Sequence, residues 1–589
     1  MLELNYNGIS NRSAWSEAGI KLPQYDPEAV AGRTMQNPAW LHFSAGNLFR
    51  AFIASLQDKL LNDGLTDHGI IAVETFDPEI LDKVYIPFDN LCIVATLEPD
   101  VETAGGGGLG TVIGSISKTY ATTSAEGYEA VRRVFINPKL QMISYTATEK
   151  AYSLRGVDGE FLPDIKADFD NYANQSTDIG ASIGAVHPNN ILTLTTAMLH
   201  ERFVAGAHPI ALVSMDNCSR NGERLRASVI EIADELERRQ VFESAFVEWL
   251  SDDSRVAFPW SMIDKITPWP SETIAKRLAG AGVANMAPLR TARGTVVAPF
   301  VNTEPAQYLV IEDNFPGGRP PLEKAGVFFT DRETVDRAER MKVATCLNPL
   351  HTALAIFGSL FRYESIAAEM KDETLLALIH RIAYIEGLPA VTDPGVINPR
   401  AFLDEVLNER LPNPMIPDTP QRIATDSSQK IPIRFGGTIR YYMEHADFQK
   451  YMPDSSIVPA PQGEMATPIS HAADLIGIPL VLAGWLRYLL AVDDNLAPYA
   501  PSADPLLGTM QNKLSGIKFN SNSADETAPV QKDSQYAQQI AATLAPILSD
   551  ASLFGADLYE AGLAGKITSM FISMLEGKGA VRKTLEKYL

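Results

Sequence analysis

The stretch AWLHFSAGNLFRAFIASLQDKLL, residues 39–61, carries three successive patterns that decide the fold. Its first five residues are a short apolar run, which is typical of a buried strand. The next four, SAGN, are small or turn-forming, and the remainder is an amphipathic helix. A strand, a tight turn of small residues and a helix in this order predict the first unit of a nucleotide-binding α/β fold. In such a unit the backbone N–H groups at the helix N-terminus meet a pyrophosphate.

Further strand candidates extend this pattern through the first half of the chain. They are GIIAVETFD (69–77), NLCIVATLE (90–98), LQMISYTATEK (140–150) and PIALVSMDN (209–217). Helical patterns lie between some of them, and such alternation predicts a parallel sheet with helices on its faces. We therefore interpret residues 1–330 as a Rossmann-like, doubly wound NAD-binding domain. The glycine run AGGGGLG (104–110) is predicted to be a loop between strands, because it lacks the strand-to-helix context of a phosphate cradle.

From about residue 331 the pattern becomes helical and strand candidates nearly vanish. Helical periodicity covers 331–393, 402–410, 437–451, 469–493 and 534–588. DSSQKIPIRFGG (426–437) is predicted to be a loop, and APYAPSADP (497–505) a proline-rich connector. Residues 331–589 are accordingly predicted to form a mostly helical substrate and catalytic domain. We expect its last part, 500–589, to pack against the rest of that domain.

Composition excludes several classes of protein. With 589 residues the chain exceeds the usual size of one core, so two domains or more are expected. A net charge of −22 argues against a nucleic-acid or anionic-membrane partner. Three widely spaced cysteines indicate neither a disulfide framework nor a paired-thiol metal site, and they favour a reducing compartment. No signal-peptide pattern opens the sequence, and the apolar run 475–486 is too short to span a membrane. A cytoplasmic protein is expected.

The turn after the first strand is the first candidate binding site. Ser44, Ala45 and Gly46 are small enough for close approach of a phosphate, although only Gly46 is a glycine. Glu74, at the end of the second strand candidate, can accept hydrogen bonds from an adenosine ribose, which favours NAD(H) over NADP(H). Its spacing from Gly46 is 28 residues, against about 20 in the usual pattern. A plain strand–helix turn and a plain surface acid remain alternatives.

A second stretch, RAERMKVATCLNPLHTALAIFGSLF (337–361), looks like one long helix that is interrupted in its middle. Pro349 removes a backbone donor and collides with the preceding turn, at a cost of about 3 kcal/mol or more. Asn348 is a weak helix former. Folding alone does not explain Asn348, Pro349 and His351 together with Lys342 close upstream, so we expect a chemical role.

Six segments, taken in order, resemble the mannitol dehydrogenase and fructuronate reductase family, the polyol-specific long-chain dehydrogenases. They are HFSAGNLFRA (42–51), TATEKAY (146–152), SMDNCSRNG (214–222), FPWSMIDKITP (258–268), YLVIEDNF (308–315) and RIATDSSQKIPIR (422–434). The resemblance extends from about residue 38 to 500. Two positions depart from the family pattern, since Ser44 stands in place of a glycine and Lys265 in place of an arginine.

The resemblance implies a role for each matching residue. The family signature Lys-x4-Asn-x2-His supplies an acid/base, an amide that holds the reacting oxygen, and an imidazole that orients the substrate. The implied catalytic residues are Lys342, Asn217, Asn348 and His351. The implied substrate-binding residues are Asp264, Arg422, Lys430 and Asn221. The implied cofactor-binding residues are Ser44, Ala45, Gly46, Asn47, Leu48, Arg50, Glu74, Thr148, Glu149 and Lys150.

The spacing in this chain is Lys-x5-Asn, one residue longer than in the family. At about 100° per residue, the family spacing puts the lysine roughly 80° from the histidine, whereas nine residues put Lys342 roughly 180° from His351. A regular helix therefore cannot present both side chains to one substrate. A π-bulge absorbs one residue and is frequent at functional sites. We predict a bulge or kink within 343–349 that returns the lysine to the site.

These residue types suit oxidation of a secondary alcohol and its reversal. A lysine can take the hydroxyl proton if burial lowers its pKa towards neutrality. Amide N–H donors can stabilise the developing alkoxide, and a nicotinamide takes the hydride. The nine histidines show no HExxH or clustered Cys/His spacing, which disfavours a zinc-dependent alcohol dehydrogenase. No metal is expected.

Within the family, the segment TCLNPLHTALA and the long C-terminal region resemble those of the bacterial D-mannonate oxidoreductases. This resemblance implies a small-molecule substrate and NADH-linked reduction of D-fructuronate to D-mannonate. The alternatives are a neutral polyol dehydrogenase of the mannitol type, a sugar-acid epimerase with an internally cycling cofactor, and a non-catalytic sugar-binding protein. Each site residue also has a structural alternative: a solvated lysine (Lys342), a core histidine (His351), turn caps (Asn217, Asn221, Asp264) and surface charges (Arg422, Lys430). The sequence does not predict the oligomeric state.

Overall fold

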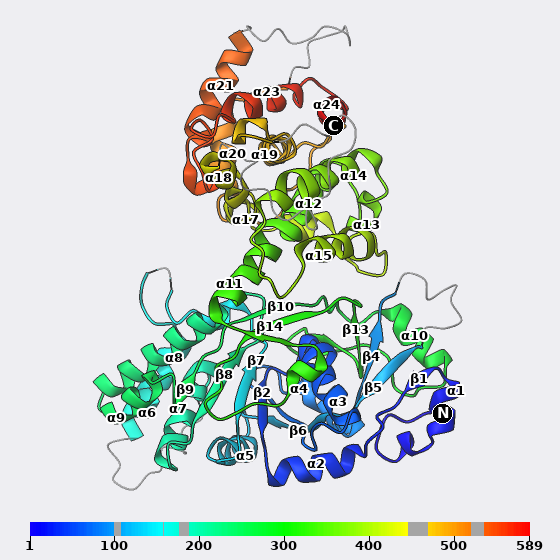
Figure 1. The fold of residues 1–589 in the computed structure, drawn as a ribbon, viewed down its shortest axis with the longest axis vertical. Helices are drawn as coiled ribbons and strands as arrows, with labels where there is room; N and C mark the ends of the chain where they lie inside the picture. The colour runs from blue at the N-terminus through cyan, green and yellow to red at the C-terminus, as the bar shows by residue number, and fades with distance from the viewer. Residues whose placement is uncertain (99–107, 157, 176–187, 446–468, 520–534) are drawn as a thin grey trace. The chain divides into compact units, whose positions relative to one another are not determined.

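The computed structural model describes residues 1–98, 108–156, 158–175, 188–445, 469–519 and 535–589. The chain forms two compact units, Met1–Asp336 and Arg337–Leu589. Figure 1 shows strands and helices in the first unit and helices alone in the described part of the second. The predicted fold class, α/β followed by a helical domain, is therefore confirmed.

A six-stranded parallel sheet forms the centre of the N-terminal unit. Its strands, from one edge to the other, are β6 (Ile116–Ala121), β3 (Ile70–Glu74), β2 (Trp40–Phe43), β7 (Met142–Tyr145), β8 (Ile210–Ser214) and β9 (Val256–Ala257). Numbered by chain position, this is the order 3-2-1-4-5-6 of a doubly wound dinucleotide-binding sheet. The strand order reverses between β2 and β7, and ligands of such sheets bind outside the carboxyl ends of the strands at that point.

The sheet is buried on both faces, as parallel sheets are. Side chains alternate between faces along each strand, so Leu41 and Phe43 of β2 join one core cluster while Trp40 joins the other. Val73 of β3 lies in the first cluster and Ala72 in the second. The helices of this unit are α1 (Arg12–Glu17), α2 (Pro27–Gln36), α3 (Ala54–Asn62), α4 (Glu79–Val84), α5 (Ala125–Phe135), α6 (Pro163–Gln175), α7 (Ile191–Val204), α8 (Asn221–Arg238), α9 (Ser244–Ser251) and α10 (Glu272–Gly280). In Figure 1, α6 to α9 gather beside β8 and β9.

One predicted strand belongs to a different sheet. The run 90–98 forms β4 (Cys92–Thr96), which pairs antiparallel with β5 (Gly110–Ile113) and parallel with β13 (Phe300–Thr303). The third strand of the parallel sheet is instead β6, which the sequence did not predict. Pairing with a strand about 200 residues downstream leaves no local pattern in the sequence. The predicted glycine loop lies mostly outside the described residues, and its last glycine begins β5.

The remaining strands form smaller sheets with antiparallel pairs. β1 (Ile20–Lys21) extends the sheet of β5, β4 and β13. β10 (Ser261–Asp264), β14 (Tyr308–Glu312) and β15 (Phe328–Thr330) form a three-stranded sheet, and β11 (Leu289–Arg290) and β12 (Val296–Val297) form a hairpin.

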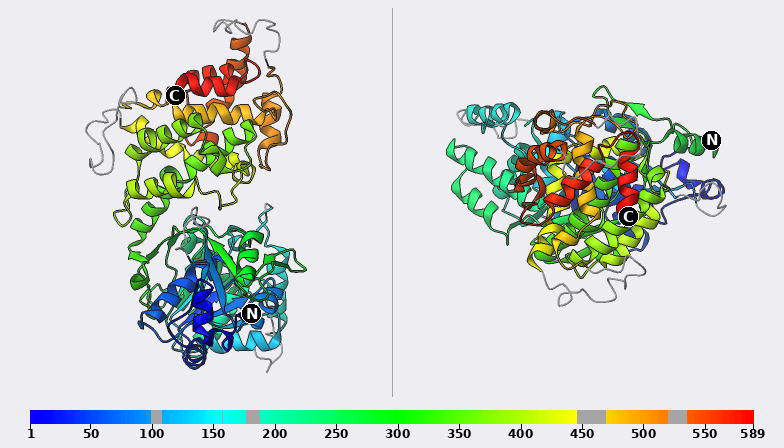
Figure 2. Two further views of the ribbon diagram at one scale, coloured as in Figure 1. Left: turned by 90° about the vertical axis from the view of Figure 1, so that its right-hand side faces the viewer. Right: turned by 90° about the horizontal axis from the view of Figure 1, so that it is seen from above.

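The described part of the C-terminal unit consists of helices, which the two views in Figure 2 also show. They are α11 (Arg332–Met341, which begins in the first unit), α12 (Asn348–Phe361), α13 (Ile366–Glu369), α14 (Glu373–His380), α15 (Pro399–Glu405), α16 (Pro420–Ala424), α17 (Ser427–Arg434), α18 (Gly436–Glu444), α19 (Gly477–Leu489), α20 (Leu507–Leu514), α21 (Gln535–Leu548), α22 (Ala551–Phe554), α23 (Ala564–Ser573) and α24 (Ala580–Tyr588). Four π-helices occur among the described residues: Phe49–Ile53, Lys342–Cys346, Arg381–Gly387 and Val406–Arg410.

The predicted loop 426–437 is wrong, because α17 occupies most of it. The carboxylate of Asp504 accepts the backbone N–H of Ser428 at 2.7 Å and the hydroxyl of Ser427 at 2.9 Å. This anchor at the first turn comes from the predicted connector, more than 70 residues downstream, so no local pattern reveals it. It stabilises a helix that has Pro432 in its interior.

The last residues pack within the same unit, as expected. Arg582 of α24 pairs with Asp372, and the N–H of Gly579 donates to the carbonyl of Asp494. The helical run Arg332–Phe361 is long and apolar enough to pass a test for membrane spans, but 78% of its most apolar window is buried inside the protein. A core helix that is mostly buried can have the same length and hydropathy, so these two properties are weak evidence for a membrane-spanning segment.

Candidate functional site

The turn after β2 has the geometry that phosphate-binding turns need. Ser44 adopts a φ of +79°, a conformation that glycine reaches without cost and that explains why the resembling family has glycine there. Its N–H donates to the carbonyl of Val73 at 2.9 Å, and the hydroxyl of Tyr85 donates to the carbonyl of Ala45 at 2.8 Å. A Cβ built on Gly46 would meet no atom within 4 Å, so the space beside this backbone is open.

Arg50 lies beneath this turn without a carboxylate partner among the described residues. It is fully buried, and its guanidinium donates to the carbonyl of Ala298 at 2.7 Å and to the amide oxygen of Asn47 at 2.9 Å. Its Nε has no hydrogen-bond partner. A buried cation beside open backbone at a helix N-terminus fits the pyrophosphate of a dinucleotide. Asn47 also donates to the carbonyl of Pro268, so its side chain is held within the protein.

Glu74 lies at the carboxyl end of β3, next to this turn. Its carboxylate accepts the N–H of Ala45 at 3.1 Å, of Phe76 at 2.8 Å and of Asp77 at 3.0 Å. A carboxylate has about four acceptor positions, so one remains for a ribose hydroxyl. Glu74 thus joins the loops after β2 and β3, a role that the sequence did not predict. Leu48 packs partly against the core, and its apolar side chain has no polar group for a cofactor.

The segment after β7 supplies the other side of the strand-order reversal. Thr148, Glu149 and Lys150 are exposed there. Glu149 pairs with Arg224 of α8 at 2.7 Å, so this carboxylate joins two surface segments. The three predicted residues lie on the edge of the sheet to which Ser44 and Gly46 also belong, since the carboxyl ends of β2 and β7 are adjacent.

His42 on β2 lies under the turn and is neutral. Its ring nitrogens are hydrogen-bonded to the hydroxyls of Ser144 at 2.7 Å and Thr146 at 3.0 Å, and its ring stacks on Phe49. Complete burial lowers its pKa to about 3. The hydroxyl of Thr146 also donates to the carbonyl of Ser44 at 3.4 Å. This histidine therefore supports the turn as a neutral hydrogen-bonding group.

The loop after β8 carries Asn217, which is exposed. The preceding Asp216 is buried and accepts hydrogen bonds from Ser214 at 2.6 Å, from Cys218 at 2.9 Å and from Tyr152. Burial raises the pKa of Asp216. These bonds hold both neighbours of Asn217 and so position its side chain at the carboxyl edge of the sheet.

The structure assigns Asn221 to the fold and not to substrate binding, which corrects the sequence prediction. Its side chain is fully buried, its Nδ2 donates to Asp216 at 3.1 Å, and its Oδ1 accepts the N–H of Ser261 at 3.0 Å. The amide therefore joins β8 to β10 and has no free group for a ligand. Asp264, the last residue of β10, is buried with 7% of its surface exposed.

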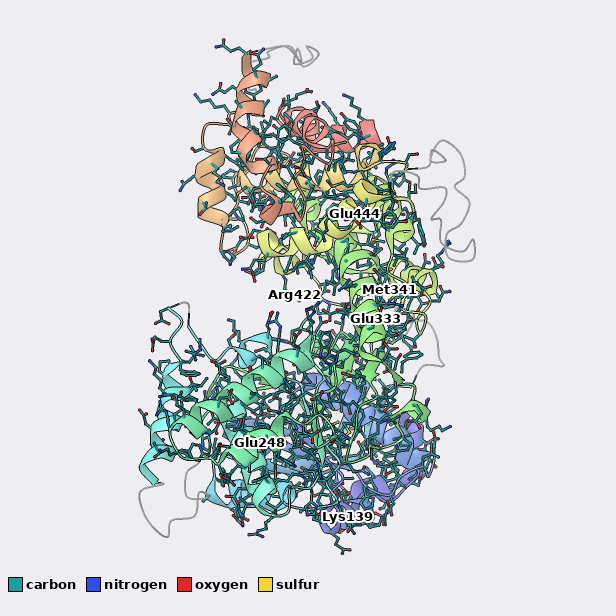
Figure 3. All side chains as sticks on the ribbon, turned by 60° about the vertical axis from the view of Figure 1, so that its left-hand side comes forward. Lys139, Glu248, Glu333, Met341, Arg422 and Glu444 are labelled. Carbon is teal, nitrogen blue, oxygen red and sulfur yellow. The ribbon has the colours of Figure 1, made fainter. Side chains whose placement is uncertain are left out.

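The predicted bulge is present in the C-terminal unit. Residues Lys342–Cys346 form a π-helix between α11 and α12, and Leu347 breaks the regular backbone with φ −125° and ψ −61°. Pro349 stands at the first turn of α12, where its missing N–H costs no helical hydrogen bond. The interruption in the sequence is thus a boundary between two helices. Met341, labelled in Figure 3, ends α11 directly before the π-helix.

Lys342 and His351 are both withdrawn from solvent. Lys342 is only 2% exposed, and His351 is partly buried on the first turn of α12. Burial lowers the pKa of His351 to about 4, with Asp418 opposing this effect and Arg434 adding to it. His351 is therefore neutral at pH 7 and can orient a hydroxyl by accepting or donating one hydrogen bond.

Positive charges surround this turn from α16 and α17. Arg422, labelled in Figure 3, is 60% exposed at its side chain and pairs with Asp418. Lys430 donates to the carbonyls of Ile423, at 3.1 Å, and Thr425. Partial burial, with Arg434 as the next cause, lowers the pKa of Lys430 to about 8.

Arg434 is a further candidate site residue, which the sequence prediction did not single out. Its guanidinium donates to the carbonyl of Asn348 at 3.4 Å and to the hydroxyl of Thr352, and burial lowers its pKa to about 10. It has no carboxylate partner among the described residues. The signal was available, since Arg434 ends the quoted RIATDSSQKIPIR segment. Asp418 and Arg410, which also lie near His351, had no such signal.

The described residues contain no group of three or more His, Cys, Asp or Glu side chains that could hold a metal. The three cysteines are free. What the two units offer chemically is a dinucleotide-binding edge in the first and a buried amine, an amide and a neutral imidazole in the second.

Comparisons with known proteins agree with this architecture. Two family descriptions match the chain, the mannitol dehydrogenase Rossmann domain over residues 38–324 and the mannitol dehydrogenase C-terminal domain over residues 334–452. The chain is 45% identical to a D-mannonate oxidoreductase of Thermotoga maritima, over 100% of this chain and 99% of the relative. It is 28% identical to a mannitol 2-dehydrogenase of Aspergillus fumigatus, over 100% and 99% of the two chains.

Two solved structures share the fold. Mannitol 2-dehydrogenase of Pseudomonas fluorescens, solved with NAD and D-mannitol, has a TM-score of 0.64 at 22% identity and covers 99% of both chains. A substrate-free D-sorbitol dehydrogenase has a TM-score of 0.71 at 22% identity, over 96% of this chain and 98% of its own.

Proposed function

Because the chain belongs to the mannitol dehydrogenase family and is a secondary-alcohol oxidoreductase, we propose that it interconverts D-fructuronate and D-mannonate with NADH as hydride donor. The name of the 45% identical relative supports the aldonate product. The observation that carries the sugar-acid assignment is the uncompensated cation Arg434 beside Asn348. A partly buried guanidinium without a carboxylate partner among the described residues favours a substrate that carries one.

The residues of this chain divide the work of reduction. Lys342 gives a proton to the ketone oxygen through its Nζ, and Asn217 and Asn348 stabilise the negative charge that develops there by amide N–H donation. His351, neutral at pH 7, orients a neighbouring hydroxyl. A bound nicotinamide supplies the hydride. In the oxidative direction Lys342 takes the proton, and no metal is needed at any step.

Binding of the two ligands draws on different parts of the chain. Ser44 to Asn47 and Arg50 hold the pyrophosphate, and the remaining acceptor position of Glu74 takes a ribose hydroxyl. The segment 148–150 borders the same edge. Lys430 and Arg422 hold the far end of the sugar together with Arg434, and Asp264 accepts a hydroxyl. We further propose that the protein works in the cytoplasm.

A panel of substrates tests the assignment. D-Fructuronate, D-tagaturonate, D-fructose and D-mannitol are offered with NADH or NAD and followed at 340 nm. The proposal expects D-fructuronate to have the highest kcat/KM, and Arg434→Met to lower this value by about tenfold or more while changing turnover of neutral substrates much less. Arg440→Met, an exposed arginine on α18, is the matched control.

A neutral polyol dehydrogenase is the second candidate, favoured by the similarity to mannitol 2-dehydrogenases. Faster oxidation of D-mannitol than of D-mannonate would establish it and would overturn the sugar-acid proposal. Interconversion of sugar acids without change at 340 nm would indicate an epimerase. Failure to bind either dinucleotide would indicate a sugar-binding protein.

A further inference from the structure

The hairpin of β11 and β12 is anchored to the loop that follows β3. The carboxylate of Asp77 is buried and accepts the hydroxyls of Thr291 at 2.7 Å and Thr295 at 2.8 Å. Glu79, at the start of α4, accepts the N–H of Ala292 at 2.8 Å. Three hydrogen bonds, all accepted by carboxylates that closely follow β3, thus fix the tip of a hairpin that lies more than 200 residues downstream.

The tip carries a cation that no carboxylate neutralises among the described residues. Arg293 is exposed, and its guanidinium carbon lies 4.4 Å from the ring centroid of Phe76. Phe76 is itself 65% exposed, so the face of its ring is accessible to this guanidinium. The neighbouring Arg290 differs, because its guanidinium donates to the carbonyl of Gly294 within the hairpin.

This pair lies beside the place where a doubly wound sheet holds an adenosine ribose. That place is the carboxyl end of the second strand in chain order, here β3, which ends at Glu74, two residues before Phe76. The charge of Glu74 is shared among three backbone N–H donors. The carboxylate of Asp77 accepts hydrogen bonds from two hydroxyls of the hairpin. The carboxylates of Glu74, Asp77 and Glu79 are therefore all engaged by N–H or O–H donors of the protein, and Arg293 is an exposed cation beside them.

We propose that Arg293 binds the 2′-phosphate of NADPH, so that the protein accepts NADPH as well as NADH. This inference rests on the proposed dinucleotide-dependent function and extends it to the specificity of the adenosine end. An arginine near the ribose is the means by which such folds accommodate a 2′-phosphate. Guanidinium and phosphate form paired, charge-assisted hydrogen bonds. The exposed ring of Phe76 fixes the guanidinium plane by a cation–π contact.

Calorimetric titration of the full-length protein with two adenosine fragments tests this inference without any substrate. Adenosine 5′-monophosphate probes the adenosine site, and adenosine 2′,5′-bisphosphate adds the phosphate in question. We expect the bisphosphate to bind at least as tightly as the monophosphate. Arg293→Ala should weaken the bisphosphate by about tenfold and leave the monophosphate within about twofold. Lys276→Ala, which removes an exposed cation from α10, should change neither.

The outcomes separate the inference from the function on which it rests. Monophosphate binding with bisphosphate binding that is about tenfold weaker, or equal losses for both fragments in Arg293→Ala, would overturn the role of Arg293 while leaving NADH dependence intact. Absence of binding for both fragments and for NADH would overturn the proposed function as well. Arg293→Lys, which keeps the charge, should retain part of the bisphosphate affinity and leave the monophosphate affinity unchanged.

Discussion

The backbone N–H of Leu347 donates to the carbonyl of Lys342 at 3.1 Å, five residues earlier in the chain. An α-helix makes this bond over four residues, so the turn between them holds one additional residue. That residue is the one by which the spacing from Lys342 to Asn348 exceeds the family signature. The π-helix therefore compensates for the longer spacing, and Lys342 remains buried at the start of the turn.

Deletion of Ala344 should convert this π-turn into an α-turn without rotating α12 relative to α11. Ala344 is chosen because it is only partly buried. We expect the deletion variant to fold and to keep about a tenth or more of its activity, because the residue removed is the one that the bulge absorbs. Circular dichroism and steady-state kinetics are the measurements.

The matched control is insertion of one alanine after Ala344, which adds about 100° of rotation between Lys342 and His351. The insertion should abolish activity in a folded protein. Equal activity in the deletion and insertion variants would show that the register of this turn does not matter.

Replacement of Lys342 with methionine should remove the proton carrier. The expected loss in kcat is about 10² to 10⁴-fold, the usual contribution of general acid–base catalysis. Binding of NADH, measured by fluorescence titration, should change by less than about twofold, since Lys342 is not among the residues proposed to hold the dinucleotide. Lys371→Met, an exposed lysine exchanged in the same way, is the control. A kcat within about threefold of the unmodified protein would exclude Lys342 as the acid/base.

Binding of an anionic substrate should depend on the charge of Lys430. Because burial lowers its pKa to about 8, the ammonium is present below that pH and is lost as the pH rises through it. KM for D-fructuronate should therefore rise above pH 8, whereas KM for a neutral ketose should rise less. Lys430→Met should flatten the KM profile of D-fructuronate between pH 7 and 9. A profile unchanged by this substitution would assign the pH dependence to another group.

His42 should make the N-terminal unit sensitive to acid. Its folded-state pKa, about 3, lies below its ordinary value of 6.5, so the unfolded chain binds a proton first as the pH falls. The stability contribution is complete above pH 6.5 and is lost progressively towards pH 3. The loss approaches about 1.4 kcal/mol per pH unit in this window.

Urea unfolding, followed between pH 4 and pH 7 for the unmodified protein and His42→Gln, measures this effect. The substitution should reduce the dependence of the unfolding free energy on pH by close to one proton. Parallel curves for the two proteins would mean that His42 titrates alike in the folded and unfolded states.

Local patterns were sufficient for the core of the fold. AWLHF contains β2, and the SAGN turn connects this strand to the helix that follows, because apolar runs and small residues act within a few positions of each other. The π-helix at Lys342–Cys346 followed from the pitch of a helix and from the spacing of three residues, which is one residue longer than in the family that the sequence resembles. The residues that both predictions use lie within a few turns of the chain.

The wrong predictions involve partners that are distant in sequence. β4 pairs with β13 and not with the parallel sheet, and α17 is anchored by Asp504. The side-chain oxygen of Asn221 accepts the N–H of Ser261. None of these three contacts has a sequence signature. Arg434 does end the segment RIATDSSQKIPIR, but it became a candidate only when its guanidinium was placed beside Asn348.

The sequence by itself determined the doubly wound first unit and the helical second unit, because strand, turn and helix preferences are short-range. The distorted turn that carries Lys342 was predicted by comparing its spacing with that of the family which the sequence resembles. Only the tertiary structure decided which polar side chains are available to a ligand and which are hydrogen-bonded within the protein. A buried polar group must find a hydrogen-bond partner, and the partner that satisfies it can lie anywhere along the chain.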